Sequence, residues 1–434
     1  MRSKFTLLIA AFLLFVGASE AAADYRKVVQ ASNILAKIEQ GEPVDYHCVI
    51  IEGDLNLSGL DLPIRYVKRS EAEILSGLSE ELKIIASPIN ITNCEIRGNI
   101  SLSNAIFWEN VDFEYTNFTG YAQLSGSCFK NYADFWRSQF CGKVNFKGAE
   151  FNKNVNFGGA VFGRDANFEG SKFGGYANFG GAKFGGEAFF AESIFSWYAY
   201  FGKVIFDGDA VFSGAVFEIF ADFGRVEFCE DAFFVEAKFS GKAFFSGANF
   251  KGYAEFLKAN FSGYSDFIGA EFGGYTNFRV TKFHRDALFR GTNFDMLVDF
   301  VSVEFIEGAD FEYAKFYGHA DFERSKFGGN TTFVDVYFGG VVDFSYANFS
   351  KVAYFGKSQP IEGYIWIDDS KDTVDSDGIL ISNVSVVLEA HKNLCTDFGF
   401  YGGVVILTEG LIGPHCFPIV ETNNSTCNDT NTDS

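Results

Sequence analysis

The sequence holds few of the residue arrangements that catalysis or nucleic-acid binding requires. Only five histidines occur among its 434 residues, and none lies close to the serine, cysteine or carboxylate partners that a nucleophile and its base need. Neither a glycine-rich phosphate loop nor a nucleophile elbow is present. The formal net charge of -21 disfavours binding to phosphate backbones. We therefore expect a protein that is not an enzyme, takes no cofactor and binds no nucleic acid.

Long apolar runs are also scarce, and past the N-terminus none is long enough to span a bilayer. The N-terminus itself has basic residues at Arg2 and Lys4, an apolar stretch over residues 5–16 and small residues at Ala21–Ala23. This pattern is typical of a secretory signal peptide, which we place at residues 1–23. The alternative is an uncleaved signal anchor, and only a retained signal would bring the protein into contact with a membrane.

Phenylalanine is the residue that the sequence has in excess, with 55 copies. From Phe107 to Phe355 it returns after five and six residues in alternation, with one exception. These positions form a lattice of 46 sites, of which 45 are Phe and one is Leu124. The residue two places before each lattice site is always Ala, Ser, Thr or Val. A fixed short period of this kind indicates a solenoid.

The spacing excludes a continuous helix or a long straight strand. In an α-helix, steps of five and six residues would place successive Phe roughly 140° apart, which makes no stripe. In a strand, the odd step of five would place them on opposite faces. The chain must therefore turn between one Phe and the next. Each short strand then sends a large and a small side chain inward, and the residues between them outward.

Several segments resemble the A-[D/N]-[L/F]-x-x motif of the pentapeptide-repeat family, among them Ala133-Asp134-Phe135, Ala166-Asn167-Phe168 and Ala320-Asp321-Phe322. The resemblance covers roughly residues 91–355. It implies an all-β solenoid, a right-handed quadrilateral β-helix with four units per coil. Because every second unit here has one extra residue, we expect about 22 residues per coil, with the extra residue at two opposite corners.

The flanking regions predict caps for the two ends of this solenoid. Helical spacing of Val29, Ile34 and Ile38 predicts an N-terminal helix, which would cover the exposed edges of the first coil. The predicted segments are 1–23 signal peptide, 24–44 N-terminal capping helix, 45–106 aliphatic first coils with a helical excursion at 70–83, 107–355 Phe-centred solenoid, 356–420 C-terminal cap and 421–434 disordered polar tail.

The residue before each lattice site points outward, so the repeat maps the surface. On one side of the square these residues fall into polar, apolar and acidic zones along the rod. An exposed apolar zone marks a contact site, for self-association or for docking of another protein. The alternative is that outward strand positions accept apolar residues because they pack well between neighbouring strands. The interaction patch consists of Phe189, Ile194, Val211, Val216 and Phe233.

The acidic zone includes Asp299, Asp321 and Asp343. Neighbouring coils lie about 4.8 Å apart, so these carboxylates repel one another unless a cation bridges them. A divalent cation is therefore a candidate ligand of this weak metal site. The alternative is a plain solvated face, and we expect no other metal site on the rod.

Eight cysteines in an exported chain permit disulfide bonds. Cys395, Cys416 and Cys427 are the candidates for a bridge in the C-terminal cap. A zinc site made by His391 and His415 with two of these cysteines is the alternative. Eleven N-x-[S/T] sequons also occur, which fits a glycoprotein.

The preferred interpretation is a non-catalytic exported structural or protein-interaction module, a rigid acidic rod that is secreted or held at the cell surface. The family resemblance also implies an alternative, because some pentapeptide-repeat proteins act as DNA mimics that inhibit or protect type II topoisomerases. Such a target is intracellular, so the signal peptide favours the first interpretation.

Overall fold

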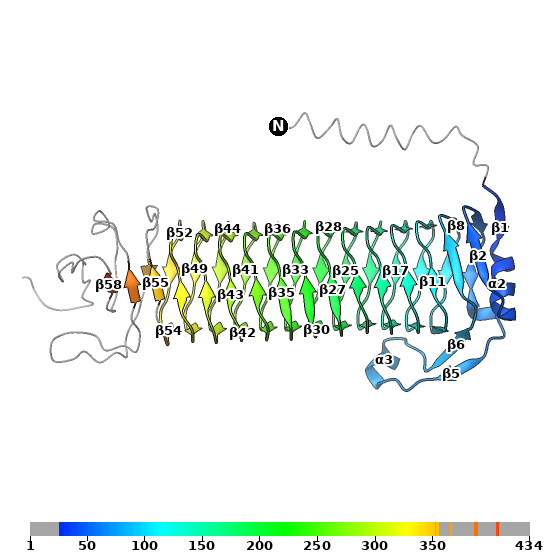
Figure 1. Ribbon diagram of the computed structural model, residues 1–434, viewed down its shortest axis with the longest axis horizontal. Coiled ribbons are helices and arrows are strands. Elements are labelled where there is room, and N and C mark those ends of the chain that lie inside the picture. The colour runs from blue at the N-terminus through cyan, green and yellow to red at the C-terminus, as the bar shows by residue number, and fades with distance from the viewer. Residues whose placement is uncertain (1–25, 352, 356–364, 367–385, 389–404, 408–434) are drawn as a thin grey trace, which may run out of the picture.

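The computed structural model describes residues 26–351 and 353–355, together with the backbone of three short strands at 365–366, 386–388 and 405–407. The described residues form a long straight rod of stacked coils (Figure 1). Two α-helices occur in this part of the chain, α2 (Ala31–Gln40) and α3 (Glu71–Leu75). Neither is long enough to cross a membrane.

Four parallel sheets run along the rod, and we call them A, B, C and D. The chain visits them in the order B, A, C, D, as in β11 (Val111–Asp112), β12 (Asn117–Phe118), β13 (Ala122–Gln123) and β14 (Cys128–Phe129). The sheets extend from β1 (Val28–Gln30) to β52 (Tyr337–Phe338) in A, from β2 (Val44–His47) to β58 (Val405–Leu407) in B, from β4 (Leu55–Asn56) to β56 (Ile365–Trp366) in C, and from β5 (Ile64–Tyr66) to β54 (Asn348–Phe349) in D.

Each strand pairs with the strand one coil later. Phe118 pairs with Phe140 and Ala122 with Val144, a separation of 22 residues in both cases. The molecule is thus a parallel β-solenoid of about 15 turns with about 22 residues per coil. This confirms the predicted solenoid and its coil length.

The lattice phenylalanines fill the interior of the square. All those from Phe107 to Phe349 are buried. Rings one coil apart stack face to face, as Phe179 does on Phe201 at 4.8 Å with an interplanar angle of 1°. Rings from different sheets meet edge to face, as Phe179 does with Phe190 at 5.3 Å and 90°. Both geometries are favourable for aromatic pairs, so one residue type can fill the whole core.

Two kinds of corner alternate around each coil. Where five residues separate lattice sites, the second residue after the Phe has a positive φ, as in Tyr115 at 55°, and the third donates its backbone N–H to the Phe carbonyl, as Thr116 does to Phe113 at 3.1 Å. This is the geometry of a type II turn. Corners with six residues contain no such residue in the described lattice. The extra residue therefore lies at two opposite corners, A to C and D to B.

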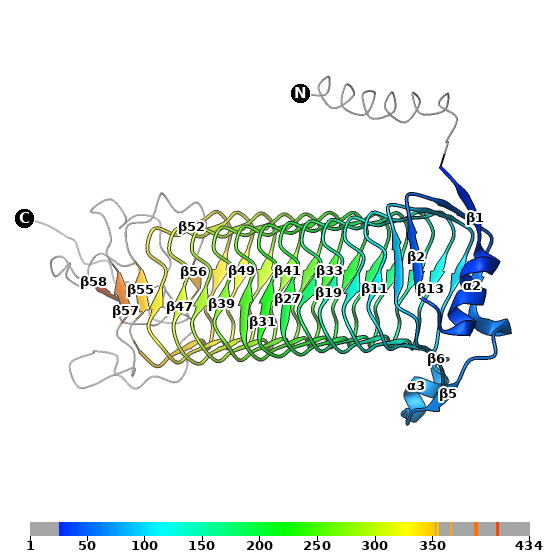
Figure 2. The same ribbon diagram turned by 45° about the vertical axis from the view of Figure 1, so that its right-hand side comes forward.

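Helix α2 lies across the N-terminal end of the rod (Figure 2), within the range predicted for a capping helix. Its apolar side chains Ala31, Ile34 and Ile38 are buried against the first coils. This covers core side chains that the first coil would otherwise expose to water.

The excursion that we predicted to be helical at 70–83 is helical only over Glu71–Leu75. Residues Glu81–Ile85 instead form β6, which pairs antiparallel with β5 and parallel with β10 (Ala105–Phe107). The prediction was wrong there because Leu82 and Ile85 complete sheet D, and this tertiary pairing overrides the local helical spacing.

The excursion forms an arm that folds back over sheet D (Figures 1 and 2). Leu78 sits over Gly126 and Gly148, where an added Cβ at Gly148 would lie 2.3 Å from Leu78 Cδ1. Arg69 is also buried and donates to the Gly126 carbonyl at 2.9 Å. The arm therefore covers the outward face of sheet D in the first coils.

The segments predicted as a C-terminal cap and a polar tail lie outside the described residues, apart from three short strands. Of these, β56 pairs with β53 (Val342–Asp343), and β57 (Val386–Leu388) pairs with β55 (Ala353–Phe355) and β58. These strands continue sheets C and B past the Phe lattice.

Candidate interaction surfaces

The outward surface of sheets B and C has three columns of side chains, from the third residue before each lattice Phe, the residue just before it and the residue just after it. In the middle column an Asp or Asn accepts a hydrogen bond from the backbone N–H two residues later. Asp134 accepts from Trp136 at 2.8 Å, and Asn167 accepts from Glu169 at 2.8 Å. These Asx contacts explain the [D/N] of the repeat motif as a turn-forming residue.

The residues of the predicted interaction patch lie side by side on two adjoining sheets. On sheet C, Phe189 pairs with Val211 and Val211 with Phe233, in β25 (Ala188–Phe189), β29 (Ala210–Val211) and β33 (Ala232–Phe233). On sheet D, Ile194 pairs with Val216, in β26 (Ile194–Phe195) and β30 (Val216–Phe217). All five side chains are half-buried.

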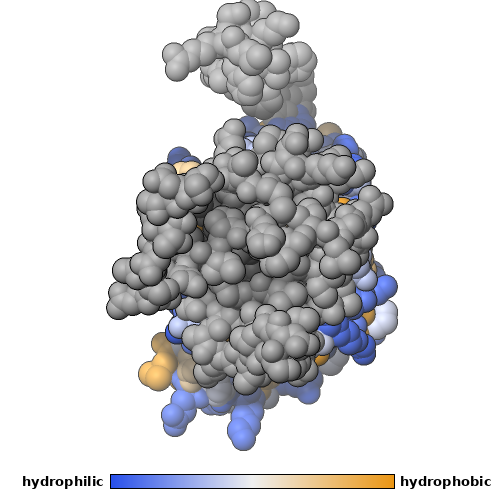
Figure 3. All heavy atoms as spheres, turned by 90° about the vertical axis from the view of Figure 1, so that its left-hand side faces the viewer, coloured by the Kyte–Doolittle hydropathy of each residue, from blue (hydrophilic) through white to orange (hydrophobic). Residues whose placement is uncertain are grey.

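The apolar surface continues around the corner from sheet D to sheet B. Trp197 is 57% exposed and Ile219 is 49% exposed there, in consecutive coils. In the view along the rod, most of the described side chains that can be seen at the outline of the molecule are hydrophilic (Figure 3).

Sheet B has a ladder of aromatic rings that the sequence reasoning missed. The rings are in contact one after another along the rod: Tyr176–Tyr198 at 5.3 Å, Tyr198–Phe220 at 4.5 Å, Phe220–Phe244 at 4.9 Å and Phe244–Tyr264 at 6.0 Å between centroids. The third residue before each lattice Phe, read every 22 residues, would have found it, because that series contains Tyr176, Tyr198, Phe220 and Tyr264.

The ring ladder is packed against the sheet and carries hydrogen bonds. Tyr198 donates its phenol to Asp222 at 3.3 Å, and Gly224 N–H donates to the same carboxylate at 2.8 Å. Burial, followed by the charge of Asp222, raises the pKa of Tyr198, so the phenol keeps its proton at physiological pH. Tyr200 lies over Gly180, where a Cβ would be 2.3 Å from the Tyr200 ring. A larger residue at position 180 would therefore displace this ring.

The predicted acidic zone has protein partners for its carboxylates. Asp299 is 5% exposed and accepts from Arg279 at 2.9 Å and from the Tyr275 phenol at 3.4 Å. Burial, followed by the charge of Asp299, raises the pKa of Tyr275 to about 12. Asp321 and Asp343 each accept from the backbone N–H two residues later. Within the described residues, no group of three or more His, Cys, Asp or Glu side chains could hold a metal ion.

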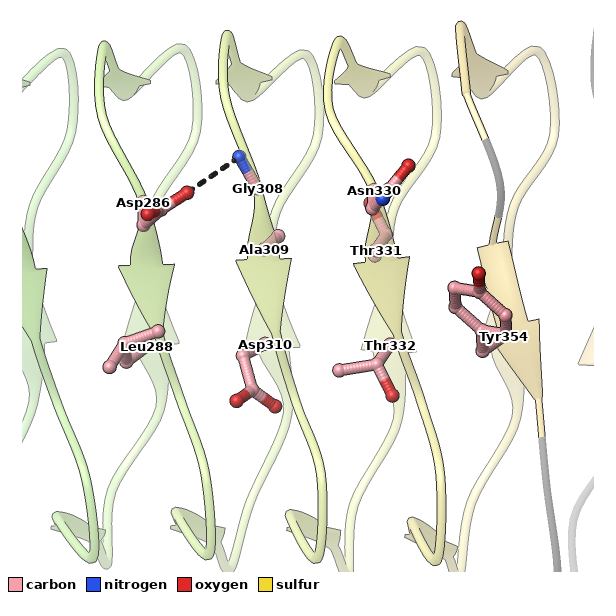
Figure 4. A pocket seen from close by; sticks show the side chains of 9 residues that line it. All are labelled: Asp286, Leu288, Gly308, Ala309, Asp310, Asn330, Thr331, Thr332 and Tyr354. Atoms are coloured by element: carbon pink, nitrogen blue, oxygen red, sulfur yellow. Dashed lines mark hydrogen bonds between the residues drawn. The ribbon is translucent and has the colours of Figure 1, made fainter.

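An open pocket lies on sheet B towards the C-terminal end of the rod (Figure 4). It forms where the short side chains of Asp310 and Thr332 lie between the larger Leu288 and Tyr354 in one column. Asp286 accepts from Gly308 N–H at 3.0 Å at its edge. The pocket is thus a gap in a column of outward side chains.

The disulfide candidates Cys395, Cys416 and Cys427 lie outside the described residues, as do His391 and His415. The cysteines in the described part have free thiols: Cys48, Cys94, Cys128, Cys141 and Cys229.

Comparison with protein families identifies the repeat. The family model described as Pentapeptide repeats (9 copies) matches residues 146–194, 168–216, 234–282 and 289–336. No curated protein and no solved structure matches the chain significantly. The matched segments all lie within the stack of 22-residue coils, and this solenoid is therefore built from pentapeptide repeats.

Proposed function

We propose that this protein is a non-catalytic structural or protein-interaction module, exported and held as a rigid acidic rod at the cell surface. The pentapeptide-repeat solenoid is typical of structural or interaction modules, which supports the first part. The observation that carries the interaction role is the interaction patch, five apolar side chains gathered on adjoining sheets in the middle of the rod.

The core supports the rigidity of the rod. Every coil is bonded to the next through four sheets, and stacked rings fill the interior without interruption from Phe129 to Phe349. A solenoid of this kind has no internal domain boundary at which it could hinge. A partner would therefore meet a surface whose side chains already have fixed spacings, which lowers the entropy that binding costs.

The interaction patch has the form of a docking surface for another protein. It covers three coils on sheet C and two on sheet D, about 10–14 Å along the rod. Trp197 and Ile219 extend it around the next corner. Apolar surface that is contiguous on this scale marks protein contact sites.

The export part of the proposal is supported by the N-terminal pattern and by the sequons. Asn330 and Asn348 both begin an N-x-[S/T] sequon and are exposed on the rod. Fractionation of cells that make the protein, with mass determination of the purified chain, tests this part. We expect the mature chain in the medium or at the surface, lacking residues 1–23 and carrying glycans; a cytosolic chain with its N-terminus intact would refute it.

Substitution of the patch tests the interaction role. Phe189→Ser together with Phe233→Ser should abolish capture of the partner from the organism's own extracellular proteins, while the thermal unfolding of the rod stays close to wild type. Val161→Ser is the matched control, because Val161 is an exposed apolar residue on sheet A, outside the patch. If the double variant leaves both sedimentation and capture unchanged, the patch is not a docking surface.

The DNA-mimic alternative fits the charge pattern less well. A mimic needs uninterrupted rows of carboxylates, as on a nucleic-acid backbone. On sheet D, Glu304 instead lies between Lys282 at 3.0 Å and Lys326 at 2.9 Å. A supercoiling assay with a type II topoisomerase and the mature protein decides the matter; inhibition or protection at stoichiometric concentration would favour the alternative.

A further inference from the structure

The middle of sheet B is a flat face with little charge. From residue 154 to residue 268 its three outward columns contain only three charged side chains, Asp222, Lys242 and Asp266. The first two columns carry the ring ladder, and the third contains only glycine and Ser246 before it reaches Ile268. A row of rings therefore lies beside a row of glycines on this face.

The strands of sheet B are also longer here. β27 (Tyr198–Tyr200), β31 (Phe220–Asp222) and β35 (Lys242–Phe244) have three residues each, whereas their neighbours β23 (Ala177–Asn178) and β39 (Ser265–Asp266) have two. The regular pairing extends to the ring positions, so the ladder is held on well-ordered backbone.

We propose that the middle of sheet B binds the same face of a second copy of this chain, with the two rods antiparallel and the two-fold axis passing between β27 and β31. This goes beyond the proposed function, because it concerns a different face from the interaction patch. The two proposals can therefore fail independently.

The pattern of side chains about this axis supports the antiparallel arrangement. A two-fold axis along the strand direction places each column opposite itself, with the order of coils reversed. Several of the resulting pairs combine rings with rings, phenols with carboxylates, and rings or amides with charges of either sign. They are Tyr198 with the partner's Phe220, Tyr200 with the partner's Asp222, Tyr176 with the partner's Lys242, Asn156 with the partner's Asp266, and Trp136 with the partner's Arg290.

The parallel arrangement is disfavoured by charge. With parallel rods the middle column would face itself at the same height, so its aspartates, including Asp134, Asp222 and Asp266, would each meet the identical carboxylate of the partner. Antiparallel rods bring together only Asp112 and Asp310 of this column. Like charges brought together in an interface cost several kcal/mol, so the charge pattern selects the antiparallel orientation.

The position and size of the face also fit a pair of rods. β27 and β31 are the seventh and eighth of the 16 strands in sheet B, so antiparallel rods would overlap along most of their length. The arm packs on sheet D and leaves this face open among the described residues. The part of this face between residues 154 and 268 measures about 29 Å by 13 Å, which is roughly 400 Å² per partner. This area is below the standard interface size, so we expect a dimer that depends on protein concentration.

Sedimentation of the mature chain over a range of concentrations tests the proposal. We expect a reversible monomer–dimer equilibrium, which Tyr200→Asp should weaken by about tenfold or more because it sets a new carboxylate opposite the partner's Asp222. Aspartate is already the usual residue of this column, so the variant should fold. The matched control is Phe233→Asp in the equivalent column of sheet C, which should leave the dimer intact.

A second variant tests the orientation. Asp222→Asn keeps the acceptor for Gly224 N–H, as Asn does elsewhere in this column. Combined with Tyr200→Asp it should restore the dimer in the antiparallel arrangement, whereas in a parallel one the new carboxylates would still face each other. A wild-type chain that stays monomeric at millimolar concentration would overturn the proposal, and so would a dimer that only Phe233→Asp disrupts or that Asp222→Asn fails to rescue.

Discussion

At the residue scale, two acidic side chains at outward strand positions, Glu255 and Asp266, are buried rather than exposed to water. Glu255 is 8% exposed and Asp266 is 9% exposed. Burial raises the pKa of both carboxyls, and the backbone N–H groups of Leu257 and Ile268 partly offset the effect. These acids therefore reduce stability when they are ionised.

Replacing one of these acids should stabilise the rod at neutral pH. Since the folded state raises the pKa of Glu255, it binds the proton more tightly than the unfolded chain, and stability is lost as pH rises through the folded pKa. Glu255→Gln removes that loss and keeps an oxygen for Leu257 N–H. We expect a higher Tm than wild type at pH 7, with the difference disappearing below the ordinary glutamate value of 4.5.

Thermal unfolding at pH 4 and pH 7 checks this prediction. Glu271→Gln is the control, because Glu271 is an exposed outward residue of sheet A. The interpretation of Glu255 as a buried acid would be wrong if both variants changed Tm equally at pH 7.

At the scale of single elements, the corners carry most of the backbone strain. Every five-residue corner needs a residue with positive φ, and the chain often uses Gly there, as at Gly181 and Gly269. Val280 has φ 58° at such a corner and is 43% exposed. A β-branched residue fits this conformation poorly.

Val280→Gly should therefore raise the free energy of unfolding, by about 1 kcal/mol, since the left-handed conformation costs an L-residue about that much or more. The backbone bond from residue 280 to the Val301 carbonyl at 3.1 Å would be kept. Urea denaturation measures the change. Val161→Gly should have the opposite sign, because Val161 lies in strand β20 (Val161–Phe162) with no positive φ to relieve.

The arm on sheet D is an insertion into one coil. Ile51 pairs with Ile96, 45 residues on, whereas Val29 pairs with Ile51 after 22, so 45 - 22 leaves 23 additional residues. Deleting residues 63–85 removes 23 residues and restores the six-residue step from Leu62 to the lattice site Ile91. We therefore expect the coil to close without the arm, with Leu62 in the place of Ile85.

Deletion of residues 63–85 should give a folded rod in which the Cys128 thiol reacts readily. Cys128 is 4% exposed in a small cluster with Leu82 of the arm and Ile106. Alkylation followed by peptide mapping should show Cys128 protected in the wild-type chain and modified in the deletion variant at a rate close to that of Cys141, which is exposed in both. Continued protection of Cys128 would mean that the arm is not its cover.

At the scale of the whole molecule, each coil depends only on its neighbours. Apart from the arm, the coils of the described rod contact one another through the stack, so its stability is approximately a sum of coil and interface terms. Register is the one global requirement, because side chains of one sheet must stack on the same sheet of the next coil.

Removing one whole coil should therefore be tolerated. Deletion of residues 224–245 removes 22 residues and joins equivalent positions, so we expect a cooperatively folding rod shorter by about 4.8 Å in small-angle scattering. Deletion of residues 224–228 removes one five-residue unit, puts every later strand on the wrong sheet and should greatly lower the Tm. Equal tolerance of both deletions would contradict the four-sheet register.

The features of this protein that its sequence predicts are those set by interactions between residues close together in the chain. The repeat period predicts the coil, the inward Phe side chains, the outward patch and the two kinds of corner. The period can be read from the sequence because each unit repeats the same pattern of residues. The strand at Glu81–Ile85 was decided by pairing with β10, which lies 22 residues further along the chain. The ring ladder on sheet B likewise became a surface only when residues 22 apart were stacked by the four sheets, and the burial of Glu255 depended on side chains from neighbouring coils. Local sequence set the shape of each unit, while contact between coils determined which outward residues form a face and how much of each meets water.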